Sequence, residues 1–282
     1  MSEVLKVQKV SKSFPGVRAL DKVTMTLRAG EVQALLGENG AGKSTLIKIL
    51  TGVYQADEGE FLINGQAVSF ESPLEATRAG IGVVHQERNL IPYFTVAENI
   101  VLQDQPQRFG LINSAQRRQM ALKALESLGL KIDPDEIVQN LSVAQMQLVE
   151  IAKALVTKTT VLLLDEPTAS ISGQETKRLF TVIERLTKQG TAVLFVSHKL
   201  EEVFEVCDTV TILRDGESVI ESSPLSDYSQ SDIVTAMVGR QLADRKKRFR
   251  TVTREDPILE LQGVSTALGH VDVSMQLHKG EV

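Results

Sequence analysis

The sequence predicts an α/β fold built around a buried, mostly parallel sheet. Five short apolar runs bounded by turn residues are typical of strands, and they span residues 31–36, 82–84, 161–164, 192–196 and 209–213. Several of these runs are apolar at every position, which is typical of strands covered on both faces. Stretches with helical spacing separate them, as expected for a parallel α/β sheet.

Composition narrows the class of protein. The chain has 282 residues, 42% of them hydrophobic, which suits one large domain, or one domain and part of another. The net charge of −5 argues against a polybasic nucleic-acid binder. No apolar run approaches the length of a membrane helix, and the N-terminus lacks an apolar signal core. One cysteine and four scattered histidines favour neither a disulfide framework nor a zinc site, so we expect a cytoplasmic domain.

Residues 95–156 differ in character from the strands on either side. They carry helical spacing, for example at Met120, Leu122, Leu125 and Leu128, and few β-branched runs. We interpret them as a mainly helical subdomain inserted into the sheet domain.

The end of the chain repeats its beginning. Residues 4–11 match residues 258–265, and residues 23–32 match residues 273–282 with six of ten positions identical. The pattern predicts a tandem protein cut just before a second phosphate loop. It divides the chain into a first domain (1–238), a charged linker (239–257) and the start of a second domain (258–282). An alternative for the basic part of the linker is contact with nucleic acid or lipid.

A phosphate-binding loop follows the first predicted strand. Residues 37–45 read GENGAGKST, with a strand before them and an apolar-patterned helix after them. The glycines let backbone N–H groups close around phosphate oxygens, and the helix N-terminus adds positive charge. The candidate nucleotide-binding residues here are Gly37, Glu38, Asn39, Gly40, Ala41, Gly42, Lys43, Ser44 and Thr45. Lys43 is expected to reach the β and γ phosphates and Ser44 to bind Mg²⁺; the alternative is an ordinary glycine-rich turn.

An acid pair ends the third predicted strand. Residues 161–166 read VLLLDE, four apolar residues and then two acids at the carboxyl edge of the sheet, where ligands of open α/β sheets bind. We expect Asp165 to hold Mg²⁺ and Glu166 to polarise the attacking water. The alternative is that the acids cap the next helix, although Pro167 and Thr168 favour a turn.

The order of the remaining motifs resembles that of the ATP-binding-cassette (ABC) family. Gln86 follows the second predicted strand, LSVAQ (141–145) precedes the VLLLDE strand by 20 residues, and His198 follows the fourth strand. The resemblance extends from the start of the chain to about residue 238. It implies a P-loop NTPase fold with a RecA-like core, an N-terminal antiparallel β subdomain and an inserted helical subdomain.

The resemblance also implies roles for single residues. Phe14 would stack on adenine, Gln86 would sense Mg²⁺ and the attacking water, and His198 would contact the γ-phosphate. Ser142 and Gln145 of the signature would face the P-loop of an opposite cassette. The alternative for Phe14 is a core aromatic, for Gln86 a polar loop residue and for His198 a strand cap. Ser142 and Gln145 also fit a capping box, which is compatible with the family role.

Two departures from the family pattern narrow the resemblance. Val143 and Ala144 replace two signature glycines, and residues 169–172 read ASIS, without the usual carboxylate. Together with SHKLEEV, these segments look like the first domain of the tandem ATPases of bacterial monosaccharide importers. That resemblance implies ATP and Mg²⁺ as ligands, membrane permease subunits docking near residues 87–97, and an indirect periplasmic sugar-binding partner. It also implies a peripheral position at the cytoplasmic face of the inner membrane.

In such proteins two cassettes pair head to tail, here with a second domain in cis or as a homodimer. We expect the site built on residues 37–45 to hydrolyse ATP well and the second site to be weaker. The alternatives are a translation-factor ATPase acting on the ribosome, a chromosome-maintenance cassette and a silent regulatory module. The short linker argues against the translation-factor ATPase. Lys43 and Ser142 are 99 positions apart with no sustained heptads between them, which argues against the chromosome-maintenance cassette. The intact Lys43, Asp165 and Glu166 argue against the silent module. No nucleic-acid partner is expected.

Overall fold

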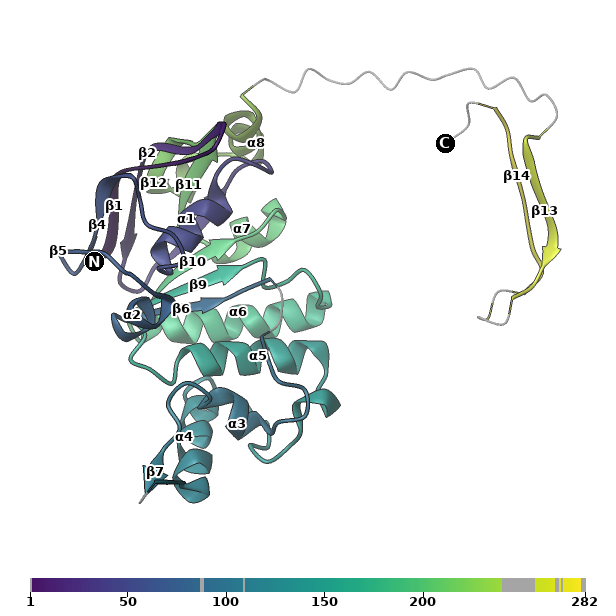
Figure 1. Ribbon diagram of the computed structural model, residues 1–282. Coiled ribbons are helices and arrows are strands. Elements are labelled where there is room, and N and C mark those ends of the chain that lie inside the picture. Colours follow the sequence, from purple (N-terminus) through teal and green to yellow (C-terminus); the bar gives the residue numbers. More distant parts are fainter. Residues whose placement is uncertain are drawn as a thin grey trace. The chain divides into compact units, whose positions relative to one another are not determined.

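The computed structural model describes residues 2–86, 89–108, 110–239, 257–266, 269 and 271–279. The chain forms two compact units that divide between residues 241 and 242. The larger unit contains two main sheets with their helices, and the smaller one contains a β-hairpin (Figure 1).

A six-stranded sheet with the strand order β12-β11-β3-β10-β9-β6 forms the centre of the larger unit. Its strands are β3 (Val32–Leu36), β6 (Ile81–Val84), β9 (Val161–Asp165), β10 (Ala192–Val196), β11 (Thr209–Arg214) and β12 (Glu217–Pro224). Neighbouring strands are parallel except for β11 and β12, which pair antiparallel. The five predicted strands are therefore all present, and the parallel sheet is confirmed.

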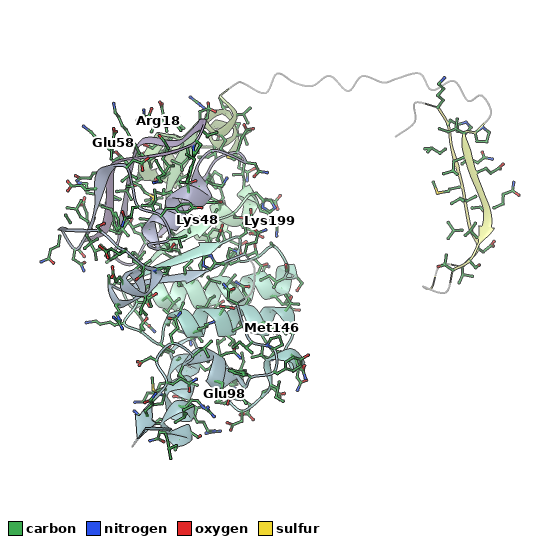
Figure 2. The ribbon with its side chains drawn as sticks, in the orientation of Figure 1. Arg18, Lys48, Glu58, Glu98, Met146 and Lys199 are labelled. Atoms are coloured by element: carbon green, nitrogen blue, oxygen red, sulfur yellow. The ribbon has the colours of Figure 1, made fainter. Side chains whose placement is uncertain are left out.

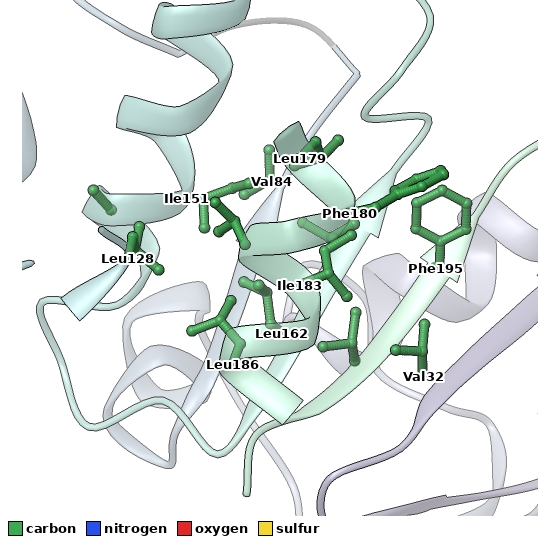
Figure 3. Packing of buried hydrophobic residues seen from close by; sticks show 14 of the residues in the cluster. Val32, Val84, Leu128, Ile151, Leu162, Leu179, Phe180, Ile183, Leu186 and Phe195 are labelled. Carbon is green, nitrogen blue, oxygen red and sulfur yellow. The ribbon is translucent and has the colours of Figure 1, made fainter. Parts of the chain in front are cut away.

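The central strands are buried on both faces because their side chains alternate between two cores. Leu162 and Leu164 of β9 belong to one core, and Val161 and Leu163 belong to the other. Helices cover the two faces: α1 (Lys43–Leu50), α2 (Pro73–Arg78), α5 (Val143–Ala154), α6 (Gly173–Lys188), α7 (Leu200–Val206) and α8 (Gln230–Val238). Figure 3 shows the core in which Leu162 and Phe195 of the sheet lie among Leu179, Ile183 and Leu186 of α6.

A second sheet is antiparallel and has the strand order β2-β1-β4-β5. Its strands are β1 (Glu3–Phe14), β2 (Val17–Arg28), β4 (Glu58–Ile63) and β5 (Gln66–Val68). Its buried side chains, such as Leu5, Leu20 and Met25, join the core that also receives α1. This is the antiparallel β subdomain that the family resemblance implies.

Residues 95–156 contain helices joined by loops, as expected for a mainly helical stretch, with one exception. The elements are α3 (Val96–Ile100), β7 (Gln107–Arg108), β8 (Leu111–Ile112), α4 (Ser114–Ser127), a 3₁₀ turn (Val138–Asn140) and α5. The exception is the small β7–β8 hairpin, which turns at Gly110 with a φ of 79°. Leu111 and Ile112 are exposed there, so no apolar alternation marks the strands in the sequence.

The smaller unit repeats the first hairpin of the larger one. Its strands β13 (Leu259–Val264) and β14 (Val273–Leu277) align Leu259 with Leu277 and Leu261 with Met275. In β1 and β2 the corresponding pairs are Leu5 with Leu27 and Val7 with Met25. Both copies then shift register before the next pair, which is Val10 with Val23 in one and Val264 with Val273 in the other.

The repeat extends to the backbone at the irregularity. Lys9 has a φ of 48° and its N–H donates to Thr24 Oγ1 at 3.3 Å, while Gly263 has a φ of 56° and its N–H donates to Ser274 Oγ at 2.9 Å. The internal sequence repeat is therefore also a repeat of structure within the described residues.

Candidate nucleotide site

A cleft of about 520 Å³ lies at the carboxyl ends of the parallel strands. The phosphate loop contributes Asn39, Gly40, Gly42, Lys43, Ser44 and Thr45 to its wall, and the ends of neighbouring strands contribute Gln86, Asp165, Glu166 and Val196. Residues far apart in the sequence thus meet in one place, because β3, β6, β9 and β10 point the same way.

The phosphate loop depends on glycine at its junction with α1. Gly42 has a φ of 104°, and a Cβ there would lie 2.6 Å from the carbonyl oxygen of Ala19. No side chain caps the N-terminus of α1, so its first N–H groups remain available to an anion. Ala41 does not line the cleft, because its side chain is buried in the core beside α1.

Lys43 folds back over the loop that precedes it. Its Nζ donates hydrogen bonds to the carbonyl oxygens of Gly37, at 2.6 Å, and Glu38, at 3.0 Å. Burial lowers the pKa of Lys43, and the negative charges of Glu166 and Asp165 oppose that shift. The ammonium group is thus held at the cleft between backbone carbonyls and two carboxylates.

Asp165 and Glu166 occupy different environments. Burial raises the pKa of Asp165, the charge of Glu166 raises it further, and His85 and Lys43 oppose the shift. Glu166 has a φ of 48°, a left-handed conformation that is unfavourable for a side chain of this kind. Its N–H donates to Val196 O at 2.9 Å, which ties this strained residue to the end of the neighbouring strand.

His198 lies beside Glu166. Its Nδ1 is 3.2 Å from Glu166 Oε1, and its side chain is 65% exposed whereas that of Glu166 is 25% exposed. His198 therefore lies next to a residue of the cleft wall, although it does not itself line the cleft. The structure brings Lys43, Asp165, Glu166 and His198 together as the sequence analysis expected, while their roles remain predictions.

The oxygen-bearing groups of the cleft fit Mg²⁺. Ser44, Gln86 and Asp165 all line it, and each offers an oxygen, the ligand type that Mg²⁺ prefers. The described residues contain no group of three or more His, Cys, Asp or Glu side chains placed to hold a metal. Mg²⁺ does not need one, since it commonly binds one or two carboxylates together with substrate phosphates.

Phe14 does not line this cleft. Its ring packs edge-on against Tyr54 with the centroids 5.3 Å apart, and Lys12 Nζ lies 5.8 Å from its centroid. The adjacent wall is formed by Val17, Arg18 and Ala19, with Asp215 and Gly216. The sequence analysis did not select these five residues. The sequence did offer one signal for Asp215 and Gly216, because an Asp-Gly pair between two strands is typical of a hairpin turn.

Ser142 and Gln145 lie apart from the cleft and form a capping box on α5. Gln145 N–H donates to Ser142 Oγ at 3.2 Å, and Ser142 N–H donates to Gln145 Oε1 at 2.9 Å. Both residues line a separate cavity of about 110 Å³ with Ile171 and Glu175. This chain therefore does not bring its own signature residues to its own phosphate loop.

A phosphate loop on a strand-to-helix turn, with an acid pair on a neighbouring parallel strand, defines a P-loop nucleotide-binding domain. The family model described as ABC transporter matches residues 20–169, which is more than half of the chain. The protein belongs to the ABC transporter family.

Two curated relatives match the whole chain. The putative ribose/galactose/methyl galactoside import ATP-binding protein 1 of Agrobacterium fabrum is 46% identical over 281 residues, which cover 100% of this chain and 55% of the relative. The ribose import ATP-binding protein RbsA 1 of Rubrobacter xylanophilus is 46% identical over 282 residues, or 56% of its length. This chain therefore spans about half the length of these relatives.

Solved structures agree with the fold. The ATP-binding cassette MJ1267, solved in its ADP conformation, is 27% identical and superposes with a TM-score of 0.74 over 85% of this chain and 100% of that one. The dimeric cassette MJ0796 bound to ADP and Pi is also 27% identical and superposes with a TM-score of 0.64 over 77% of this chain. Within the described ranges, no helix combines the length and hydropathy that a membrane crossing requires.

Proposed function

We propose that the chain is a nucleotide-binding cassette that hydrolyses Mg-ATP to energise the import of a monosaccharide. The observation that carries the proposal is the placement of Glu166, paired with His198, in the same cleft as Lys43 and the phosphate loop. The names of the curated relatives, which are ribose and galactoside import ATP-binding proteins, support the cargo class. None of these names supports the alternative of an ATPase acting on the ribosome.

The phosphate loop binds and orients the triphosphate. Its backbone N–H groups and the Lys43 ammonium neutralise phosphate oxygens, so Lys43 exchanges its bonds to Gly37 and Glu38 for bonds to phosphate. Ser44, Asp165 and Gln86 would hold Mg²⁺, which would supply positive charge to offset the negative charge that develops in phosphoryl transfer.

Glu166 activates the water that attacks the γ-phosphorus. Its carboxylate accepts a proton from that water as the new P–O bond forms and the bond to the β-phosphate oxygen breaks, which yields ADP and phosphate. His198 would contact the γ-phosphate and keep the Glu166 carboxylate oriented through the 3.2 Å contact. Val17, Arg18 and Ala19 would form the side of the cleft that meets the base, and Phe14, which lies outside the cleft wall at the end of β1, would stack on the base only if its ring turned away from Tyr54.

The active form requires a second cassette. Ser142 and Gln145 are remote from the cleft of their own chain, so we infer that they face the phosphate loop of another cassette, in cis or in a homodimer. The repeated hairpin supports the division into a first cassette (1–238), a linker (239–257) and the start of a second cassette (258–282). Membrane permease subunits would dock near residues 87–97, at the cytoplasmic face of the inner membrane. Closure of the cassettes would then drive the conformational change of the permease. A sugar-binding protein would deliver the cargo.

The test is ATP hydrolysis by the chain across a range of protein concentrations, with Glu166→Gln as the control. Activity that rises more steeply than linearly with concentration, and that Glu166→Gln abolishes without loss of ATP binding, is the expected result. Hydrolysis that persists in Glu166→Gln would contradict the assignment of the catalytic base. Hydrolysis that is strictly linear in concentration would contradict the shared site.

A further inference from the structure

Glu202, in the first turn of α7, is the acceptor of three hydrogen bonds. Its carboxylate accepts from the hydroxyl of Thr168, from Ser197 Oγ at 3.3 Å and from Lys199 Nζ at 2.9 Å. Lys199 also donates from Nζ to the carbonyl oxygen of Thr168, at 3.3 Å, and from its backbone N–H to Ser197 Oγ, at 3.1 Å. These four residues form one network, the Glu202 network; Figure 2 labels Lys199.

The network is buried where it joins the two loops. Thr168 is 2% exposed and Ser197 is 5% exposed, and the Glu202 side chain is 12% exposed. Hydroxyl groups at such positions need a hydrogen-bond partner, because a buried polar group that is left unpaired loses its bonds to water without replacement. A single carboxylate satisfies both hydroxyls, and the Lys199 ammonium balances its charge.

The members of the network flank Glu166 and His198, which contact each other. Thr168 is two residues after Glu166, in the loop that follows β9. Ser197 and Lys199 are the residues immediately before and after His198, in the loop that follows β10. Glu202 therefore connects the loop that carries Glu166 to the loop that carries His198, from a third element, α7.

We propose that Glu202 is a positioning residue that holds Glu166 and His198 in their mutual geometry. It acts through Thr168 and Ser197 and not at the phosphate. Glu166 needs such support because its backbone is in the left-handed region, where the surrounding structure has to maintain the conformation. The inference rests on the proposed function, in which these two side chains act together on the attacking water and the γ-phosphate.

The test compares Glu202→Gln and Thr168→Val with the matched control Glu201→Gln. Glu202→Gln keeps the shape of the side chain but loses its charge and one acceptor, and Thr168→Val removes one hydroxyl at nearly constant volume. Glu201 is the adjacent, exposed acid, so its variant reports any general effect of a lost charge on α7. The measurements are kcat and KM for ATP, affinity for a fluorescent ATP analogue, melting temperature, and amide hydrogen exchange without nucleotide.

We expect kcat to fall by about 10- to 100-fold in both variants, with KM and analogue affinity within about threefold of the unmodified chain. The double variant should be about as slow as the slower single variant, because both act through one network. Amides of residues 166–171 and 197–199 should exchange faster in Glu202→Gln, and Glu201→Gln should match the unmodified chain in every measurement.

Unchanged hydrogen exchange in both loops, or unchanged kcat in both variants, would overturn the positioning role. A joint fall of melting temperature, affinity and kcat in Thr168→Val, the milder variant, would also overturn it, since that pattern describes a loss of folding. If hydrolysis by the unmodified chain does not depend on Glu166, the proposed function fails, and the exchange measurement still decides whether Glu202 holds the two loops.

Discussion

Glu166 Oε1 lies 3.2 Å from His198 Nδ1, although the two residues are 32 positions apart in the sequence. The pairing of β9 with β10 produces this contact, since the register sets Asp165 opposite Val196 at the ends of the two strands. Glu166 is the first residue after β9, and its N–H donates to Val196 O. A one-residue slip between these strands would separate the pair.

Lys43 predicts a pH dependence of nucleotide binding. Phosphate binds the protonated ammonium, and burial lowers the pKa of Lys43, so affinity should fall as the pH rises through a value below that of an ordinary lysine. Titration with a fluorescent ATP analogue from neutral to alkaline pH measures it. Lys43→Met should weaken binding by about 10-fold or more at neutral pH, and Lys43→Arg should bind without the alkaline decline. A decline that is identical in Lys43→Arg would assign the effect to another group.

The raised pKa of Asp165 predicts that the charge of this residue destabilises the nucleotide-free protein. Its pKa is raised in the folded state, so ionisation is easier in the unfolded chain and the penalty is present at every pH above that raised pKa. Asp165→Asn should therefore raise the melting temperature at neutral pH. The gain should shrink as the pH falls and Asp165 of the unmodified chain becomes protonated in both states. Thermal unfolding at several pH values, without nucleotide, measures this effect. A gain in melting temperature that persists at low pH would show that the charge of Asp165 is not its cause.

Two glycines of the phosphate loop should respond differently to alanine. A Cβ on Gly42 would lie 2.6 Å from Ala19 O at a φ of 104°, whereas a Cβ on Gly40 would meet no atom within 4 Å at a φ of 86°. Gly40→Ala therefore carries only the backbone strain of a left-handed residue, about 1–2 kcal/mol of unfolding free energy. Gly42→Ala adds a collision with backbone and should cost more than about 3 kcal/mol. Chemical denaturation compares the two, and equal losses would show that the loop relaxes around Gly42.

Two substitutions of Ser142 should separate its structural role from its proposed role at phosphate. Ser142→Ala removes the cap of α5 and should cost about 1 kcal/mol of stability, whereas Ser142→Gly should cost only a few tenths, because glycine is tolerated at N-caps. Both variants lack the hydroxyl that would face phosphate across a paired cassette. Hydrolysis at high protein concentration should therefore fall in both, even though thermal unfolding distinguishes them. Full activity in Ser142→Gly would leave the hydroxyl with a capping role alone.

Local patterns were sufficient to predict the strands and the phosphate loop. Several strands are continuous apolar runs because they are covered on both faces, and the phosphate loop (37–45) follows β3 directly. The antiparallel sheet was anticipated only from the resemblance, because irregular registers interrupt the alternation of buried and exposed positions along β1. The β7–β8 hairpin was missed because its strands are only two residues long and Gln107, Leu111 and Ile112 are exposed.

Relationships between distant segments could not be predicted from patterns. Glu202 reads as one acid among several on an amphipathic helix, and its partner Thr168 is 34 residues away. Val17 and Gly216 come to the cleft through the packing of the antiparallel hairpin against the β11–β12 turn, where Asp21 N–H bonds to Gly216 O at 2.8 Å. Such placements depend on how two sheets pack, which no local spacing encodes.

The two copies of the repeated hairpin differ in one respect. The segment between Ser11 and Lys22, which includes the end of β1 and the start of β2, has ten residues, 12–21, and the segment between Ser265 and Asp272 has six, 266–271. The register and the serine contact are nevertheless the same, with Lys22 N–H donating to Ser11 Oγ at 3.1 Å and Asp272 N–H donating to Ser265 Oγ at 3.0 Å. The two copies therefore keep the same alignment with ten or with six residues between the bonded positions, and in the first copy the longer segment carries Val17, Arg18 and Ala19 beside the cleft.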